Sequence, residues 1–175
     1  NDASIAYYDK ETGDCSSSNV FESMNKGLKL GDTGQDMLVT KDKIYISVST
    51  SGVVYVTDLN CAVIDSIKSE KNGQLQEPRS FTTYGNYVYV TYYDGFVGRI
   101  NRKTNKLDEK QVQVGKYPEE LKIANGKIYV ANSGQMYGDD VSVIDINTFS
   151  KIKDIKVAQN PTKVEVDRLG NIYVI

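Results

Sequence analysis

A short apolar-Tyr-apolar triplet recurs along the whole chain, and it constrains the fold more than any other feature. Its tyrosines are Tyr45, Tyr89, Tyr129 and Tyr173, which follow one another at intervals of 44, 40 and 44 residues. Repeats of this length belong to architectures in which one supersecondary unit is used several times. The contents of one unit therefore decide the fold.

A second landmark keeps the same phase as the triplet. The chain has 3 prolines, Pro78, Pro118 and Pro161, and each stands 11 or 12 residues before a triplet tyrosine. Gly34 takes the corresponding place before Tyr45. An alternating apolar run follows each of these positions, which indicates a β-strand between the proline and the triplet.

A third landmark is an alternating run that ends in Asp or Asn. Its end residues are Asp9, Asp58, Asn101 and Asp145, and a turn-like sequence follows each of them. Asp and Asn side chains hydrogen-bond to the backbone of the next residues in such turns. We therefore expect these four residues to cap turns, each of which leads into a further strand.

Each unit thus contains four short strands and no helical period, which is typical of a β-propeller blade. We predict an all-β fold, a β-propeller of four-stranded antiparallel blades, with about four blades in a single domain over 1–175. The predicted parts are a partial blade at 1–33 with two strands, blades at 34–76, 77–117 and 118–160, and the start of another at 161–175. The triplet tyrosines should pack between blades.

Composition excludes several function classes. The chain has no His, so His-based triads, general bases and metal ligands are absent. The net charge of −2 makes a nucleic-acid partner unlikely, because such binders carry a basic excess. No stretch approaches the roughly 20 apolar residues of a transmembrane helix. Cys15 and Cys61 form no metal or redox motif, and whether they pair stays open.

Three segments carry a resemblance to a known family. Lys127–Gly134 (KIYVANSG), Val141–Asp145 (VSVID) and the pair Asn160-Pro161 resemble the YVTN-repeat, or YncE-like, β-propellers, whose repeats are WD40-like. Residues 19–25 and 30–37 are similar to the first blade of YncE-like proteins from Bacteroidetes. The resemblance implies a seven-bladed ring in a secreted or lipid-anchored protein of the periplasm or cell surface, with any lipid anchor upstream of Asn1.

An arc of about four blades would leave two apolar blade faces open, which a soluble monomer rarely tolerates. We therefore expect the remaining blades, or another chain, to close the ring. Residues that begin the first strand of each blade should then surround the channel mouth. In this chain they are Gln35, Asp36, Arg79, Glu119, Glu120, Thr162 and Lys163.

Loops between the second and third strands open on the same face of a propeller. The longest of them is the insert 134–140, and a loop that outgrows its equivalents in other repeats is a functional candidate. We predict no cofactor and no metal site, because the adjacent carboxylates of Asp139 and Asp140 rarely point at one ion. The candidate ligand-binding residues are Arg79, Tyr92, Tyr93, Tyr117, Glu119, Gln135, Tyr137 and Lys163.

The favoured function is a non-catalytic binding or scaffold propeller outside the cytoplasm. It would present the channel-mouth face to a small ligand or a protein partner, and cell-surface nutrient uptake is one setting for it. The alternative is a propeller enzyme of the lyase, lactonase or quinoprotein type, with its catalytic residues in blades outside this chain. Substitution of the candidate residues should leave thermal stability nearly unchanged if they line a surface.

Overall fold

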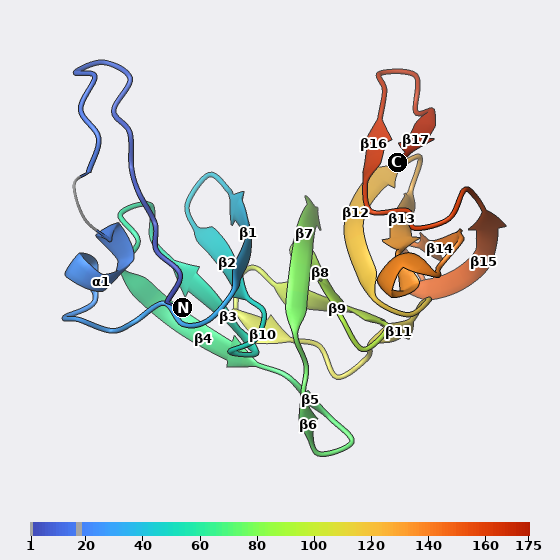
Figure 1. The fold of residues 1–175 in the computed structure, drawn as a ribbon, viewed down its shortest axis with the longest axis horizontal. Helices are drawn as coiled ribbons and strands as arrows, with labels where there is room; N and C mark the ends of the chain where they lie inside the picture. Colours follow the sequence, from blue (N-terminus) through green and yellow to red (C-terminus); the bar gives the residue numbers. More distant parts are fainter. Residues whose placement is uncertain (1, 17–18) are drawn as a thin grey trace.

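The computed structural model describes residues 2–16 and 19–175, and it consists mainly of antiparallel β-sheets (Figure 1). Three of these sheets are complete, and their strands lie in the order in which they occur in the sequence. The first sheet contains β1 (Gly34–Val39), β2 (Ile44–Val48), β3 (Val53–Thr57) and β4 (Val63–Lys68).

The second sheet has a divided outer edge, because two short strands both pair with β9. Its strands are β7 (Pro78–Tyr84), β8 (Tyr87–Tyr92), β9 (Phe96–Asn101), β10 (Lys106–Leu107) and β11 (Val112–Gln113). The third sheet contains β12 (Pro118–Ala124), β13 (Lys127–Asn132), β14 (Asp140–Asp145) and β15 (Ser150–Lys156).

Smaller elements complete the chain. The remaining strands form two hairpins, β5 (Glu70–Lys71) with β6 (Gln74–Leu75) and β16 (Val164–Val166) with β17 (Ile172–Val174). Two short helical segments are α1 (Val20–Met24) and the 3₁₀ turn η1 (Gly134–Met136). No helix in the described part of the chain is long and apolar enough to cross a membrane.

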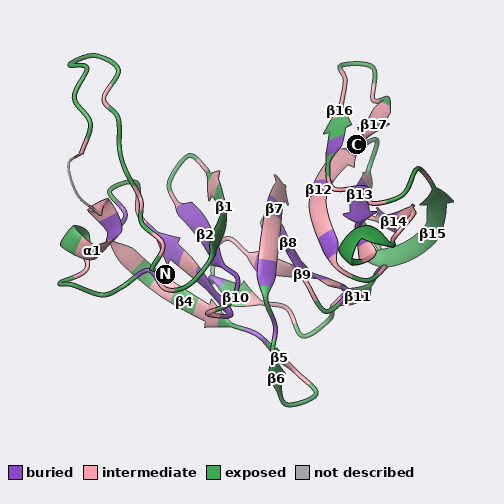
Figure 2. Cartoon of the chain, viewed as in Figure 1, coloured by how far each residue is buried: buried purple, intermediate pink, exposed green. Residues whose placement is uncertain are grey.

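The sheets are arranged as consecutive blades. The first strand of each sheet contacts the first strand of the next, from β1 to β7, β12 and β16 (Figure 1). Clusters of buried apolar side chains join neighbouring sheets. The buried residues, purple in Figure 2, include stretches of the strands inside these sheets. This radial packing confirms the predicted fold class of four-stranded antiparallel blades.

The triplet tyrosines pack as predicted only where a complete sheet follows. Tyr45 is buried against Phe81 and its neighbours in the second sheet, and Tyr89 is buried against Phe149 in the third. Tyr129 is only half-buried and Tyr173 is 57% exposed. The expectation of buried packing was therefore wrong for Tyr173, because the described residues contain no sheet after β17 that could cover it.

The N-terminal segment departs from the prediction of two strands within 1–33. Among the described residues, 2–16 form a hairpin held by a few hydrogen bonds, with isolated bridges at Tyr8–Cys15 and Asp2–Asp32. The helix α1 then takes the place of a further strand. Its Phe21 is fully buried against the outer face of the first sheet, so this segment covers the apolar face that we expected to be open.

The predicted turn caps are confirmed in all four places. The Oδ1 atom of Asp145 accepts hydrogen bonds from the backbone N–H groups of Asn147 (3.0 Å) and Thr148 (2.8 Å). The Oδ1 atoms of Asp9, Asp58 and Asn101 accept equivalent bonds in their own turns. The two cysteines, which sequence reasoning left open, are unpaired: Cys15 is exposed and Cys61 is buried.

Candidate functional site

Irregular strand starts direct side chains away from the sheets. The pairing register shifts between Gly34 and Asp36, and between Pro78 and Phe81; the same shift occurs between Pro118 and Leu121 in the third sheet. A β-bulge of this kind bends the strand and re-aims its side chains. The residues at the shifts therefore face the space enclosed by the first strands.

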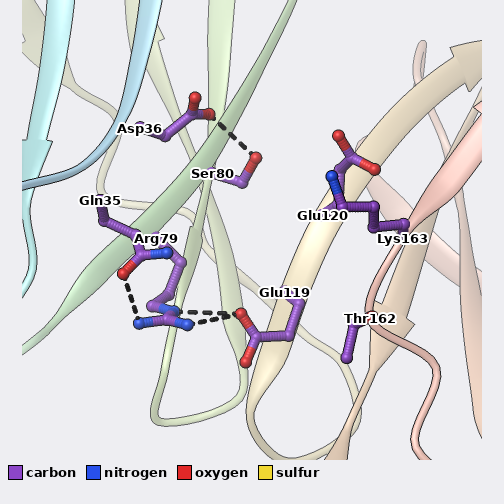
Figure 3. A pocket seen from close by; sticks show the side chains of 8 residues that line it. All are labelled: Gln35, Asp36, Arg79, Ser80, Glu119, Glu120, Thr162 and Lys163. Carbon is purple, nitrogen blue, oxygen red and sulfur yellow. Dashed lines mark hydrogen bonds and ion pairs between the residues drawn. The ribbon is translucent and has the colours of Figure 1, made fainter.

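That space is a cavity of about 390 Å³ bordered by four consecutive sheets. Its lining residues are Gln35, Asp36, Arg79, Ser80, Glu119, Glu120, Thr162 and Lys163 (Figure 3). The structure thus brings together all seven residues assigned to the channel mouth from the sequence. Ser80 was missed, although it follows Arg79 at the position that Asp36, Glu120 and Lys163 occupy in the other repeats.

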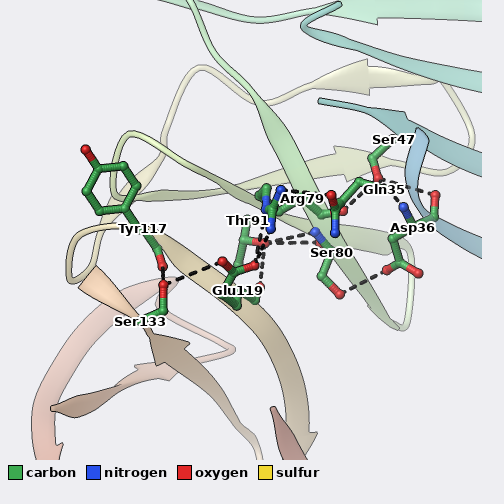
Figure 4. Close-up of polar contacts among 9 residues, drawn as sticks. All are labelled: Gln35, Asp36, Ser47, Arg79, Ser80, Thr91, Tyr117, Glu119 and Ser133. Atoms are coloured by element: carbon green, nitrogen blue, oxygen red, sulfur yellow. Dashed lines mark hydrogen bonds and ion pairs between the residues drawn. The ribbon is translucent and has the colours of Figure 1, made fainter. Parts of the chain in front are cut away.

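Arg79 is the most constrained side chain of the cavity. Its Nη2 and Nε atoms lie 2.7 and 3.2 Å from Oε2 of Glu119, and its Nη1 donates to the side-chain oxygen of Gln35 at 2.8 Å (Figures 3 and 4). Its guanidinium also stacks over the ring of Tyr93, 4.5 Å from the centroid. These contacts hold the guanidinium in one orientation without using all of its donors.

Hydroxyl groups link the rim of one sheet to the next. Ser47 Oγ donates to the carbonyl of Arg79 at 2.6 Å, and Thr91 Oγ1 donates to the carbonyl of Glu119 at 2.8 Å (Figure 4). Asp36 Oδ2 accepts from Ser80 Oγ at 2.9 Å, a further bond between the first and second sheets. The relative positions of the cavity residues are therefore fixed by hydrogen bonds as well as by apolar packing.

Lys163 differs from Arg79 in having no side-chain partner. Within the described residues its ammonium group makes no ion pair or hydrogen bond, and the residue is exposed. Figure 3 places it on the side of the cavity opposite Gln35 and Arg79. The cavity therefore contains one cation held by a carboxylate and one cation open to a ligand.

Two of the candidate tyrosines stand beside this cavity. The rings of Tyr93 and Tyr117 meet edge to face, with centroids 4.7 Å apart, and Tyr93 carries the Arg79 guanidinium on its face. Partial burial, followed by the nearby carboxylate of Glu119, raises the pKa of the Tyr93 hydroxyl. The two rings therefore form an aromatic pair next to the cavity, with Tyr93 against Arg79 and Tyr117 against Tyr93, although neither is among the lining residues.

Tyr92 does not belong to the site, and its assignment as a ligand-binding residue was wrong. Its side chain is buried in the core between the first and second sheets, with Tyr45 and Phe81. Burial strongly raises the pKa of its hydroxyl. Successive residues of a strand face opposite sides, so the neighbour of the half-buried Tyr93 points into the core.

The insert forms a separate hollow of about 450 Å³. Its lining residues are Lys116, Tyr117, Asn132, Gly134, Tyr137, Gly138, Asp139 and Asp140. Tyr137 is 83% exposed, and Gln135, also exposed, lines neither hollow. Gln135 and Tyr137 therefore do not join Arg79 and Lys163, and Tyr117 lines the hollow of the insert while its ring contacts Tyr93.

The adjacent carboxylates of the insert are used separately. Asp139 pairs with Lys156 Nζ at 2.6 Å, and Asp140 accepts from the side-chain amide of Asn132 at 2.5 Å. In the described ranges, 2–16 and 19–175, no three His, Cys, Asp or Glu side chains are grouped as metal ligands.

No protein-family model matches the chain, and no curated protein sequence matches it. Solved structures do match it. The hydrazine synthase of Kuenenia stuttgartiensis is 21% identical, with a TM-score of 0.65 over 80% of this chain and 38% of the other. The WD40 β-propeller domain of Doa1 is 15% identical, with a TM-score of 0.68 over 85% of this chain and 51% of the other.

Two computationally designed proteins are also similar. This chain covers 48% of Ika8 with a TM-score of 0.61, and 98% of Ika4 with a TM-score of 0.58, at 14% and 15% identity. The chain therefore spans about half or less of three of these four proteins. The likenesses show that the chain has the β-propeller fold.

Proposed function

We propose that the protein is a non-catalytic binding propeller whose channel-mouth cavity receives a small polar molecule or a loop of a protein partner. The observation that carries this proposal is the contrast between Arg79, which is oriented by three neighbours, and Lys163, which has none among the described residues. A cavity with a few oriented polar groups and an aromatic border is typical of a ligand site.

The mixed charge of the cavity indicates the kind of ligand. Its carboxylates and cations, Asp36, Glu119, Glu120, Arg79 and Lys163, nearly balance one another. A ligand that carries an anionic group for Lys163, together with hydrogen-bond donors for the carboxylates, therefore fits better than a polyanion. The location outside the cytoplasm and the YncE-like family are parts of the same proposal. Their support is the sequence resemblance of residues 127–134, 141–145 and 160–161, and of residues 19–25 and 30–37.

A fragment screen by NMR tests the binding site. We expect small polar fragments that carry a carboxylate to shift the amide signals of Gln35, Arg79, Glu119 and Lys163, and Lys163→Ala to weaken that binding at least tenfold. Fragments that cluster only at the insert, or only between sheets, would contradict the assignment.

The control variant is Lys103→Ala. Lys103 lies in the capped turn after Asn101, in the turn between β9 and β10, and does not line the cavity. Lys103→Ala removes one positive charge, as Lys163→Ala does. A loss of fragment binding in Lys103→Ala would therefore indicate a general electrostatic effect.

A further inference from the structure

Backbone hydrogen bonds fix the walls of the hollow at the insert. The N–H group of Gly134 donates to the carbonyl of Lys116 at 3.1 Å, and that of Gly138 donates to the carbonyl of Ser133 at 2.8 Å. On the other side of the insert, the N–H group of Asn160 donates to the carbonyl of Gly138 at 2.7 Å. The residues that line the hollow all belong to the third sheet, its insert and the link that precedes this sheet.

A chain of hydrogen bonds orients the side chain of Asn132, which lines this hollow. Asn132 is the last residue of β13 and lies opposite Asp140, the first residue of β14. Its Nδ2 donates to Asp140 Oδ1 at 2.5 Å and to Ser142 Oγ at 2.9 Å. Ser142 Oγ donates its own hydrogen to Asp154 Oδ1 at 2.7 Å, so it can only accept from Asn132. These partners fix which way the Asn132 amide points.

The amide oxygen of Asn132 is left without a hydrogen-bond donor. Asn132 is 1% exposed, and within the described residues nothing donates to its Oδ1. Buried side-chain oxygens of Tyr45, Ser49 and Tyr92 also lack a partner there, but none of these residues lines either hollow. Buried polar atoms in folded proteins nearly always have a partner. The unpaired Oδ1 therefore points to a donor that a molecule in the hollow supplies.

Asp140 is a half-buried carboxylate without a cation of its own. Lys156 lies opposite Asp140 in the strand register, yet its Nζ pairs with Asp139 at 2.6 Å. In the part of the chain that the structure describes, Asp140 makes no ion pair, and Lys116, which also lines the hollow, pairs with neither carboxylate. The hydrogen bond to Asp139, followed by the charges of Asp139 and Asp140, raises the pKa of Lys156. This end of the sheet therefore favours a further positive charge.

The unpaired groups of the hollow define the chemistry of a ligand. The Asn132 oxygen and the Asp140 carboxylate accept hydrogen bonds, and a protonated primary amine donates three and accepts none. Its charge would also offset that of Asp140, which a hydroxyl group would not do. Tyr117 and Tyr137 line the same hollow, and tyrosine rings attract cations and contact apolar groups. A carboxylate or phosphate would instead meet Asp139 and Asp140 as like charges.

We propose that the hollow of the insert is a second binding site, which takes a small organic amine in its protonated form. The ammonium group lies against Asp140 and Asn132, and the apolar part of the molecule lies against Tyr117 and Tyr137. This site is separate from the channel-mouth cavity, where Lys163 is proposed to take an anionic group. The insert then has a function of its own and does not extend the channel mouth.

Titration with phenethylamine, followed by NMR, tests this site. The amine carries an ammonium group on a short aromatic body, and phenethyl alcohol is an uncharged molecule of nearly the same shape. We expect the amine to shift the amide signals of Asn132, Tyr137 and Asp140. It should bind about tenfold more tightly than the alcohol, because hydrogen bonds between charged groups are stronger than neutral ones. Equal affinities would overturn the proposal, since apolar contact alone would explain them.

Two substitutions in the hollow should act in opposite directions. Asp140→Asn keeps an oxygen opposite Asn132 but removes the charge, and should weaken amine binding about tenfold. Lys116→Ala removes a positive charge from the lining and should strengthen amine binding about twofold. Binding that is lost in Lys116→Ala and kept in Asp140→Asn would identify an anion site and overturn the proposal.

The control variant is Glu109→Gln. Glu109 is exposed in the connection between β10 and β11 and does not line the hollow. Glu109→Gln removes one negative charge, as Asp140→Asn does, and should leave amine binding unchanged. An equal loss of binding in both variants would show a general effect of charge and would contradict the site.

Tyr137→Ala keeps the test decisive if thermal unfolding shows that Asp140→Asn disturbs the third sheet. Tyr137 is 83% exposed, so its truncation spares the fold, and it should weaken amine binding about threefold. Absence of phenethylamine binding, or undiminished binding in Tyr137→Ala, would overturn the proposal.

The two binding sites can be tested separately. Lys163→Ala should leave amine binding at the insert unchanged, and Asp140→Asn should leave the binding of carboxylate fragments at the channel mouth unchanged. Failure of one site is therefore distinguishable from failure of the other.

Discussion

At the residue scale, single side chains with the same role recur once per blade. Asp9, Asp58, Asn101 and Asp145 cap equivalent turns, although one of them is an amide and three are carboxylates. The shared function is to accept hydrogen bonds from backbone N–H groups. The charge is therefore secondary to the position of the oxygen.

Substitution of Asp145 tests this interpretation. Asp145→Ala should lower the Tm by a few degrees. Asp145→Asn should have nearly the Tm of the unmodified protein at neutral pH, because the side-chain amide oxygen of Asn101 caps the equivalent turn. Thermal unfolding followed by circular dichroism measures both. Equal losses for Ala and Asn would show that the carboxylate charge is required.

The pH dependence of the Asp145 cap has a definite sign. Hydrogen bonds, chiefly from the Thr148 backbone N–H, lower the pKa of Asp145 in the folded protein. A carboxyl whose folded pKa is depressed stabilises the protein above its unfolded pKa, about 4, and this contribution is lost as the pH falls through the folded pKa. The Tm difference between the unmodified protein and Asp145→Ala should therefore narrow below about pH 4.

The pair Arg79–Glu119 gives the other prediction at this scale. Both side chains are more than four-fifths buried, so Arg79→Ala would leave the Glu119 carboxylate with little solvent and without its cationic partner. We expect a loss of about 1–3 kcal/mol in the free energy of unfolding, between the values for exposed and fully buried pairs. This revises our expectation from the sequence that stability would hardly change.

Chemical denaturation measures this loss, and the exposed pair Lys151–Asp154 provides the control. Lys151→Ala should change the free energy of unfolding by no more than about 0.5 kcal/mol. A similarly small effect for Arg79→Ala would mean that Glu119 is adequately solvated without the guanidinium.

At the element scale, the buried triplet tyrosines pack against the next sheet, while the strands that carry them are paired within their own sheets. Tyr89 on β8 packs with Phe149 of the third sheet, and Tyr45 on β2 packs with Phe81 of the second. Identical sequence patterns therefore differ in burial, because only some of them have a complete sheet after them in the chain. Tyr129 and Tyr173 show this gradient directly.

Alanine substitutions should reproduce this gradient. Tyr89→Ala removes a fully buried aromatic ring and should cost about 3–5 kcal/mol, as should Tyr92→Ala. Tyr129→Ala should cost clearly less, because within the described chain its sheet is followed only by the two-stranded hairpin β16–β17 and Tyr129 is half-buried. Equal losses for Tyr89→Ala and Tyr129→Ala would mean that another sheet packs on β13 in solution.

At the scale of the whole molecule, the first and the third sheet differ in what covers their outward sides. The first sheet is covered by α1, and the Asn25 side chain ties that segment to the sheet by bonds to Cys61 and Val63 at 2.8 Å. The last sheet is followed by a hairpin alone, with Tyr173 and Ile175 exposed. Stability should therefore fall from the N-terminal sheet towards the C-terminal hairpin.

Hydrogen exchange should resolve this order. Amides of β2 and β8, which lie inside complete sheets, should exchange slowest, and those of β16 and β17 fastest in dilute protein. Uniform protection across all sheets would contradict the predicted gradient.

Much of the fold was predictable from the sequence because it depends on local, repeated features. The phase of Tyr45, Pro78 and Asp145 marks strands and turns, since pleat alternation and turn capping act over a few residues. The set of residues around the cavity followed from the same phase, because each blade contributes the equivalent position.

Tertiary structure alone decided what those local features could not specify. The strand pattern does not determine which side of a sheet is covered, so Tyr92 was assigned to the surface and Tyr173 to the core. Nor does it show that α1 replaces part of a blade, or that Arg79 is held by Glu119, because these depend on groups far apart in sequence. Packing between separate sheets is a non-local property, and only their arrangement in space determines it.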